Sequence, residues 1–289
     1  MDAAERGLQY YLGWFANPIF SKNGDYPPVM KNTIAYRSAL EGFNVSRLPT
    51  FREDEVNFIK GTSDFFGLTH DETLLASEGA IIPISTPSFK HDMNISQFYD
   101  NTWPRTPIGS YSIAPWGMYN ILMYIHNRYN SPEIYITGSG YPDSGTLKDT
   151  GRITYFQQYL SSVLDAISNG VLVTSYTFWS LLDGFEWEHG YNLKYGVVHV
   201  DFDNTSRTRT LKLSAKFVKY LTKERHIEYG PNVGGIVIIP EKLDGLEDDE
   251  DSDAEVKVTT ETIKKKIDVV NDNITSIENI FPDIPEIEI

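Results

Sequence analysis

Cysteine is absent from the 289 residues of this chain. Without a thiol, the sequence can form no disulfide, thiolate nucleophile, zinc finger or iron–sulfur cluster. Long hydrophobic runs are absent too, since stretches such as Gly235–Ile239 span only a few residues. We therefore expect no transmembrane helix and no membrane partner. The segment Met1–Arg6 has neither a basic region nor an apolar core, so we expect no secretory signal in this chain. These absences assign no compartment, because a missing disulfide framework does not prove a reducing one.

Basic residues are scarce, with 25 Lys and Arg against 40 Asp and Glu, a net charge of −15. The excess is unevenly divided: residues 1–240 carry 24 acidic and 20 basic groups, whereas residues 241–289 carry 16 and 5. The larger segment is therefore nearly balanced, and most of the negative charge lies in the last fifty residues. Neither segment has the basic footprint of a nucleic-acid-binding protein.

Hydrophobic residues make up 40% and aromatic residues 13% of the chain, which excludes disorder throughout. The length allows one large domain or two small ones. Apolar spacing and cap residues predict helices over residues 2–20, 29–40, 50–60, 115–129, 152–169 and 214–223. Short apolar runs predict strands over 64–68, 133–137, 173–178 and 196–202, the second ended by the glycines at 138–140. Strands separated by helices indicate βα units and a parallel sheet.

Two stretches do not follow this alternation. Residues 76–113 are rich in Pro, Ser and Asn, and we expect a long surface excursion there. After residue 230 the composition changes, so we divide the chain into a body, 1–230, and an acidic, largely disordered tail, 231–289. Residues 259–280 of the tail place isoleucine and valine at helical spacing. That pattern predicts either a weakly ordered tail or a short amphipathic helix that docks on a partner.

Several motifs in the body occur in an order and spacing typical of one family. They are GWFANPIF at 13–20 with GDYP at 24–27, KGTSDFFGL at 60–68 and SYTFWSLLDGFEW at 175–187, followed by GVVHVDF at 196–202 and RTLKLSA at 209–215. Over about residues 3–230 the chain resembles glycoside hydrolase family 1, the β-glucosidases with their lactase-like and myrosinase-like relatives. The resemblance implies hydrolysis of O-glycosyl compounds with retention of configuration, and hence a place in carbohydrate metabolism. Family members are often secreted.

The family fold is a (β/α)8 TIM barrel with its active site at the carboxyl ends of the strands. The matching motifs belong to the second half of that barrel. We therefore expect an α/β fold, a partial barrel with about strands five or six to eight, followed by the disordered acidic tail. A truncated gene model, a duplicated fragment or a chain that needs a partner would each produce such a sequence.

The chemistry that the resemblance implies is testable at single residues. Retaining glycosidases use two carboxyl groups, one as nucleophile and one as acid/base. In the family the acid/base glutamate lies in a Thr-Phe-Asn-Glu-Pro stretch, which does not occur here. The nucleophile lies in an Ile-Thr-Glu-Asn-Gly stretch, which matches Ile136–Gly140 and places Gly138 at the nucleophile position. Since glycine cannot form a glycosyl-enzyme bond, we predict that this chain alone is inactive.

A family tyrosine that hydrogen-bonds the nucleophile matches Asp71, within Thr69-His70-Asp71. Asp71 is therefore either an exposed loop residue or a substitute carboxylate that reaches the space left by Gly138. Asp is one methylene shorter than Glu and here comes from a different strand, which favours the exposed loop residue.

The sugar-holding part of the family site is better preserved. The resemblance places Trp179 under the sugar ring, Glu186 as acceptor for the distal hydroxyls and Trp187 as indole N–H donor. It implies a β-glycoside or other sugar as a weak ligand, unless these residues are inherited packing without a ligand. No histidine pair has zinc-site spacing and no phosphate-binding loop occurs, so we expect no metal and no cofactor.

Two further interpretations remain open at the level of the sequence. The chain is a non-catalytic interaction protein that binds a protein partner through its acidic tail, or it is half of a split barrel that a second chain completes. In the split barrel Gly138 would still leave the nucleophile missing.

Overall fold

The computed structural model describes residues 2–80, 86–225 and 227. The chain forms two compact units, one made of residues 1–67, 72–105 and 112–135 and the other of residues 68–71, 106–111 and 136 onward. The acidic run, the amphipathic segment 259–280 and the boundary expected near residue 230 lie outside the described residues.

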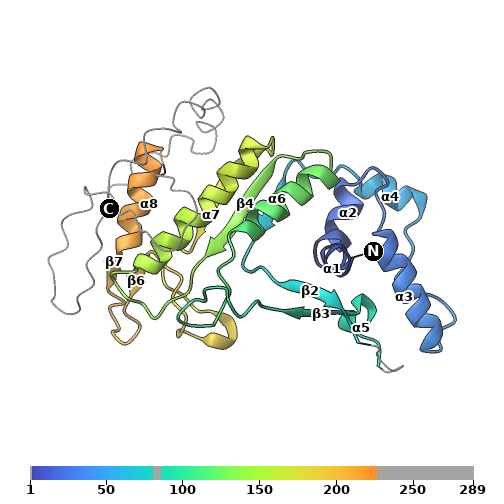
Figure 1. The fold of residues 1–289 in the computed structure, drawn as a ribbon, viewed down its shortest axis with the longest axis horizontal. Coiled ribbons are helices and arrows are strands. Elements are labelled where there is room, and N and C mark those ends of the chain that lie inside the picture. The colour runs from blue at the N-terminus through green and yellow to red at the C-terminus, as the bar shows by residue number, and fades with distance from the viewer. Residues whose placement is uncertain (1, 81–85, 226, 228–289) are drawn as a thin grey trace. The chain divides into compact units, whose positions relative to one another are not determined.

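The first unit begins with one continuous helical run (Figure 1), made of α1 Ala3–Leu8, the π-helical η1 Gln9–Gly13 and α2 Trp14–Phe20. The Asp2 side chain caps it by accepting a hydrogen bond from the Ala4 N–H at 3.3 Å. The run agrees with the helix predicted over residues 2–20 and continues through Pro18 to Phe20, because proline removes only its own N–H.

Three further helices of the first unit lie where the sequence predicts them, with ends that differ by at most three residues. They are α3 Pro28–Leu40, α4 Glu53–Ile59 and α6 Trp116–Arg128. The predicted start of α4 at residue 50 is wrong. The Arg52 N–H donates to the Glu55 side chain at 2.8 Å, and the helix begins at Glu53. A buried cluster of Tyr10, Met30, Ile34, Leu48 and Met93 forms the core of this unit.

The stretch 76–113 is more ordered than the sequence indicates. The strands β2 Leu75–Glu78 and β3 Ile95–Phe98 pair antiparallel with Leu75 opposite Phe98, and α5 Phe89–Met93 lies between them in the chain. Elements of four or five residues are too short for hydrophobic periodicity to reveal, which is why an irregular excursion was expected.

The central sheet has the strand order β1-β4-β5, with β1 Phe66–Thr69, β4 Ile134–Gly140 and β5 Val173–Trp179. The Phe66 N–H donates to the Glu133 carbonyl at 2.7 Å and the His70 N–H to the Gly138 carbonyl at 3.0 Å. Both partners advance together along the two strands, so β1 and β4 run parallel. The strand β4 continues through the glycines that were expected to end it.

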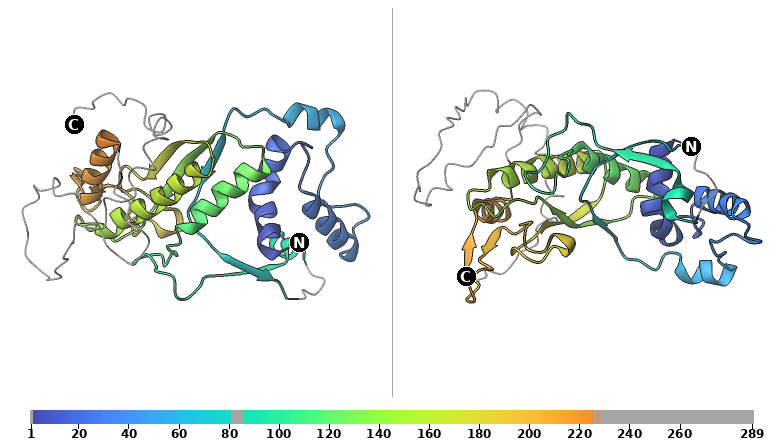
Figure 2. Two further views of the ribbon diagram at one scale, coloured as in Figure 1. Left: turned by 45° about the horizontal axis from the view of Figure 1, so that its top comes forward. Right: turned by 90° about the horizontal axis from the view of Figure 1, so that it is seen from below.

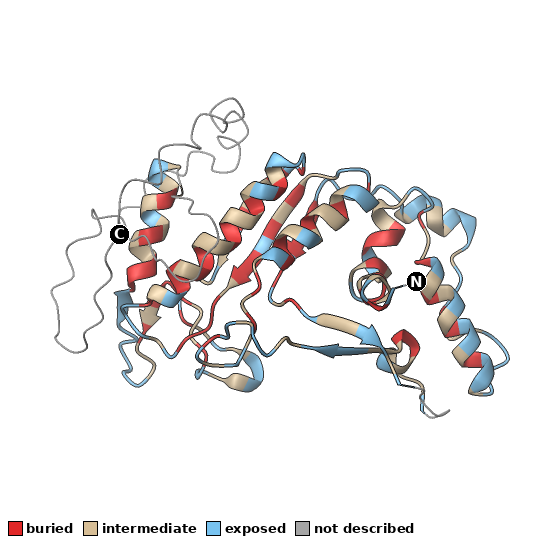
Figure 3. Cartoon of the chain, viewed as in Figure 1, coloured by how far each residue is buried: buried red, intermediate tan, exposed pale blue. Residues whose placement is uncertain are grey.

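In the second unit, α7 Thr150–Ser168 lies along β4 and β5 (Figures 1 and 2). Its buried residues alternate with more exposed ones along the helix (Figure 3), and Phe156 meets Phe178 of β5 edge to face at 4.8 Å. The helix α8 Leu213–Glu224 packs on α7. The strand expected at 196–202 is shorter: β6 Val198–Val200 pairs antiparallel with β7 Arg209–Leu211, outside the parallel sheet.

Candidate functional site

The carboxyl end of β4 carries Gly138, at the position where a nucleophile was sought. Its carbonyl accepts the His70 N–H at 3.0 Å. An ideal Cβ at Gly138 would lie 3.4 Å from the Thr69 Cγ2 atom, which is ordinary van der Waals contact. Crowding therefore does not require glycine here, and the backbone itself has room for the first atom of a side chain.

Gly140, two residues further along β4, is a glycine for a different reason. An ideal Cβ there would lie 2.4 Å from the Trp179 carbonyl oxygen and 3.0 Å from the Tyr195 ring. No real side chain tolerates such a contact with the backbone, so the close approach of β4 and β5 depends on glycine at this position.

Ser139, between the two glycines, turns toward α7. Its hydroxyl lies 2.9 Å from the Tyr155 hydroxyl, and both residues are buried. The Tyr155 ring stacks on Tyr159 at 4.0 Å, and burial raises the pKa of Tyr155 well above its ordinary value. Ser139 therefore belongs to the packing between β4 and α7, where it orients a buried phenol.

The end of β1 places His70 and Asp71 beside Gly138, since the His70 backbone is bonded to it. The His70 ring is buried, its Nδ1 atom has no hydrogen-bond partner, and burial lowers the pKa of the imidazole to about 4. The Asp71 side chain reaches solvent, and partial burial raises the pKa of its carboxyl. Asp71 was singled out from the sequence, whereas His70 was not weighed as a functional group.

Tyr195 is a residue of this site that sequence reasoning missed. Burial is the main cause of its raised pKa, and the nearby Tyr111, Glu186 and Asp71 raise it further. The structure therefore brings Asp71 and Glu186, which lie far apart in the sequence, to the surroundings of one phenol. No local motif marks Tyr195, because its neighbours come from three separate segments.

The three residues expected to hold a sugar lie at the end of β5 and in the loop that follows. The Trp179 side chain is 49% exposed and that of Trp187 is 80% exposed. Glu186 is half-buried, and burial raises the pKa of its carboxyl, with Asp183 adding to the shift and His189 opposing it. Both indole rings thus have open surface, and the carboxyl lies between them in the chain.

A buried group of charged side chains lies beneath this loop and was also missed. Arg152 on α7 is fully buried and contacts Asp143 at 2.6 Å and Asp149 at 2.9 Å. Lys212, also fully buried, contacts Asp183 at 2.9 Å. An aspartate within the apolar motif SYTFWSLLDGFEW was the one sequence signal that could have pointed to it.

Among the described residues, no group of three or more His, Asp or Glu side chains is placed to hold a metal ion. No helix in this part of the chain is long and apolar enough to cross a membrane.

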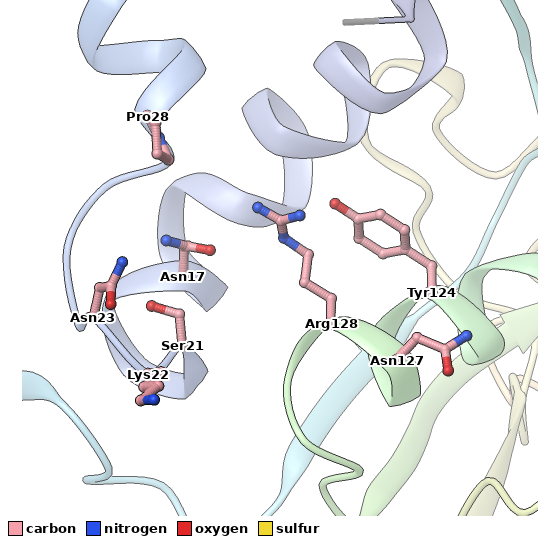
Figure 4. Close-up of a pocket in the computed structure, with 8 residues that line it drawn as sticks. All are labelled: Asn17, Ser21, Lys22, Asn23, Pro28, Tyr124, Asn127 and Arg128. Carbon is pink, nitrogen blue, oxygen red and sulfur yellow. The ribbon is translucent and has the colours of Figure 1, made fainter.

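The first unit carries a shallow hollow of about 590 Å³ (Figure 4), which contains none of the predicted site residues. It is lined by Asn17, Ser21, Lys22, Asn23, Pro28, Tyr124, Asn127 and Arg128. The Arg128 guanidinium is already paired with Glu5 at 3.2 Å.

Comparison with known proteins decides the family. The sequence model of glycosyl hydrolase family 1 matches residues 1–227. The chain belongs to glycosyl hydrolase family 1. It is 43% identical over 225 residues to the lactase-like protein of Mus musculus, covering 76% of this chain and 39% of that protein. It is 38% identical over 235 residues to the cytosolic beta-glucosidase of Homo sapiens, covering 78% of this chain and 48% of that protein.

Solved structures of family 1 members agree. Aphid myrosinase superposes with a TM-score of 0.69 at 37% identity, over 76% of this chain and 47% of that one. The rice beta-glucosidase Os3BGlu6 gives a TM-score of 0.68 at 33% identity, over 76% and 46%. The chain thus spans somewhat less than half the length of these relatives. The family resemblance drawn from the sequence motifs is confirmed.

Within this family 1 chain, the described site is an α/β arrangement at the carboxyl ends of a parallel sheet. The site consists of two parts. One is the loop after β5, which carries aromatic and carboxylate side chains, and the other is the end of β4, a strand without an acidic side chain between Ile134 and Gly140.

Proposed function

We propose that this family 1 chain holds a sugar ring weakly and does not cleave glycosidic bonds by itself. The observation that carries the proposal is Gly138 at the end of β4. A retaining glycosidase needs two carboxyl groups about 5–5.5 Å apart, one of which bonds covalently to the sugar. Gly138 offers no atom for that bond, and no Thr-Phe-Asn-Glu-Pro stretch in this sequence offers the acid/base.

Asp71 is the one carboxylate that could stand in for the nucleophile, and two observations weigh against it. The hydrogen bond from the His70 N–H to the Gly138 carbonyl puts Asp71 just beyond the end of the neighbouring strand β1, and its side chain is one methylene shorter than glutamate. If Asp71 has a catalytic role, turnover of an aryl β-glucoside is abolished by Asp71→Ala.

The sugar-contact residues support the binding half of the proposal. A sugar has an apolar face that packs on an aromatic ring and a hydroxyl rim that a carboxylate accepts. Trp179 and Trp187 are exposed, and Glu186, which lies between them in the chain, is partly accessible. A family 1 beta-glucosidase from Humicola insolens has been solved in complex with glucose. Because few groups contribute, we expect a dissociation constant of about 1 mM or weaker, roughly −4 kcal/mol.

The fold part of the proposal is that β1, β4 and β5 are strands six, seven and eight of the family barrel. Their parallel order, with α6 and α7 as connecting helices, supports that assignment. The carboxyl ends of these strands are then where the family builds its site. We propose a body of residues 1–230 and an acidic tail of 231–289 as the domain division.

Saturation-transfer NMR with methyl β-glucoside tests the binding. We expect a weak signal from the wild-type chain that Glu186→Gln reduces at least threefold. Glu188→Gln is the matched control, because Glu188 is exposed two residues away in the same loop. Loss of signal in neither variant, or equally in both, would contradict the assignment of Glu186. Free glucose accumulating during the measurement would contradict the absence of hydrolysis.

A further inference from the structure

The loop that carries Glu186 and Trp187 is tied together at its tip by its own backbone. The Glu186 N–H donates to the Gly190 carbonyl at 2.7 Å, and the His189 N–H donates back to the Glu186 carbonyl at 2.8 Å. The tip is otherwise open, since Phe185 and Trp187 are 60% and 80% exposed. The orientation of the tip therefore depends on the residues at the base of the loop.

The base consists of two neighbouring segments: residues 180–183, which precede the tip in the chain (the entering segment), and residues 195–198, which follow it (the leaving segment). The Val197 N–H donates to the Ser180 carbonyl at 2.9 Å, and the Asp183 N–H donates to the Val198 carbonyl at 3.0 Å. The two segments approach so closely that an ideal Cβ at Gly196 would lie 2.1 Å from the Asp183 nitrogen. A rigid two-stranded base thus supports the tip.

The Asp183 carboxylate fastens this base to the body of the second unit. The side chain is 3% exposed, and one oxygen accepts the Gly196 N–H at 2.9 Å and the Lys212 ammonium at 2.9 Å. The other oxygen lies 3.2 Å from His199 Nδ1 and 3.4 Å from the Val200 nitrogen. One carboxylate therefore joins the entering segment, the leaving segment and the residue that precedes α8.

Arg152 on α7 also binds the backbone of the leaving segment. Its guanidinium donates to the Gly196 and Lys194 carbonyls, each at 2.7 Å, and pairs with Asp143 and Asp149. Asp149 differs from Asp183 in one respect: its remaining contacts are to the Ser214 N–H at 2.8 Å and the Ser214 hydroxyl at 2.6 Å on α8. The two aspartates are equally buried members of one cluster, but only Asp183 belongs to the loop.

We infer that Asp183 is a positioning residue for sugar contact, which sets where Glu186 and Trp187 lie without touching the sugar. This inference rests on the proposed function, in which those two residues hold the ligand. Hydrogen bonds to a buried carboxylate are strong, because no water competes for the carboxylate oxygens. Several such bonds therefore hold the two segments of the loop base in one arrangement. Removing it leaves the tip intact but frees its base to move.

The test compares Asp183→Asn with Asp149→Asn in chains labelled with 5-fluorotryptophan. The five tryptophans give separate 19F signals, and Trp187→Phe identifies the one that reports on the tip. We expect both variants to lower the thermal unfolding midpoint. We expect only Asp183→Asn to shift or broaden the Trp187 signal and to weaken methyl β-glucoside binding at least fivefold. Equal effects of both variants on Trp187, or no effect of Asp183→Asn, would overturn the inference.

His199→Leu keeps the test decisive if Asp183→Asn does not fold. His199 is partly exposed and contributes one of the carboxylate's contacts, so its replacement leaves the Lys212 pair in place. We expect a smaller shift of the same Trp187 signal, and an unchanged signal would count against Asp183. If the wild-type chain binds no glucoside, the proposed function fails, whereas the 19F comparison still decides whether Asp183 positions the loop.

Discussion

At the scale of single residues, the two glycines at the end of β4 have different causes. Gly140 is required by the Trp179 carbonyl, which an added Cβ would approach to 2.4 Å. An added Cβ at Gly138 would lie 3.4 Å from the Thr69 Cγ2 atom, an ordinary contact distance. Close contact with a first side-chain atom therefore requires glycine at position 140 but not at position 138.

Alanine at each of these positions separates the two cases. We expect Gly138→Ala to change the free energy of unfolding by less than about 1 kcal/mol, because the methyl group fits and glycine is itself unfavourable in a strand. We expect Gly140→Ala to cost about 1–3 kcal/mol, as overpacking does. Urea denaturation of both variants measures the difference. Equal losses would show that Gly138 is also sterically required.

His70 makes the stability of the chain depend on pH. Its pKa falls from 6.5 to about 4 on folding, so below pH 6.5 the unfolded chain takes up a proton that the folded chain does not. Stability is therefore lost as the pH falls from about 6.5 to 4, by about 3 kcal/mol in full. Denaturation at pH 7 and pH 4 should show His70→Gln losing less than the wild type. The same pH dependence in both would contradict a buried neutral histidine.

Sequence reasoning proposes site residues only where they belong to contiguous motifs. Gly138, Asp71, Trp179, Glu186 and Trp187, which remain predictions, each lie within such a stretch. Tyr195 and Arg152 could not be found in this way. Tyr195 is surrounded by groups from several segments, and the burial of Arg152 depends on carbonyls more than forty residues further along the chain.

At the scale of elements, the long helices and the three strands of the parallel sheet were predictable, because each has enough residues to show a period. The predictions are wrong where a tertiary contact determines the extent or pairing of a strand. The strand β4 continues past Gly138, whose carbonyl accepts the His70 N–H, and β6 pairs with β7 instead of joining the sheet. The hairpin of β2 and β3 depends on pairing across a wide gap in sequence.

Arg152 is the side chain that ties the strand-end loops of the second unit together. Replacing it with methionine leaves Asp149 buried without its cation and leaves Asp143 with Lys212 alone, at 3.7 Å. Breaking a buried ion pair in this way typically costs about 3–5 kcal/mol. We expect Arg152→Met to lower the urea midpoint strongly. Arg52→Met is the control, since that arginine pairs with Asp54 on an exposed surface and contributes little. A comparable midpoint in both variants would mean that the buried cluster is not stabilising.

At the scale of the whole molecule, family membership and activity are separate matters. The body matches glycosyl hydrolase family 1 over residues 1–227, and the chain spans between 39% and 48% of the relatives compared above. Most of the net charge of −15 belongs to residues 241–289, beyond that match. The acidity of the chain therefore says little about the proposed sugar site, which lies at the ends of β4 and β5.

Turnover of a β-glucoside with a chromogenic leaving group tests the central claim most directly. The wild-type chain should release chromophore no faster than a buffer blank, because Gly138 supplies no nucleophile. The Asp71→Ala variant should behave in the same way. Turnover well above the blank in the wild type, lost on Asp71→Ala, would contradict the account and identify Asp71 as the catalytic carboxylate.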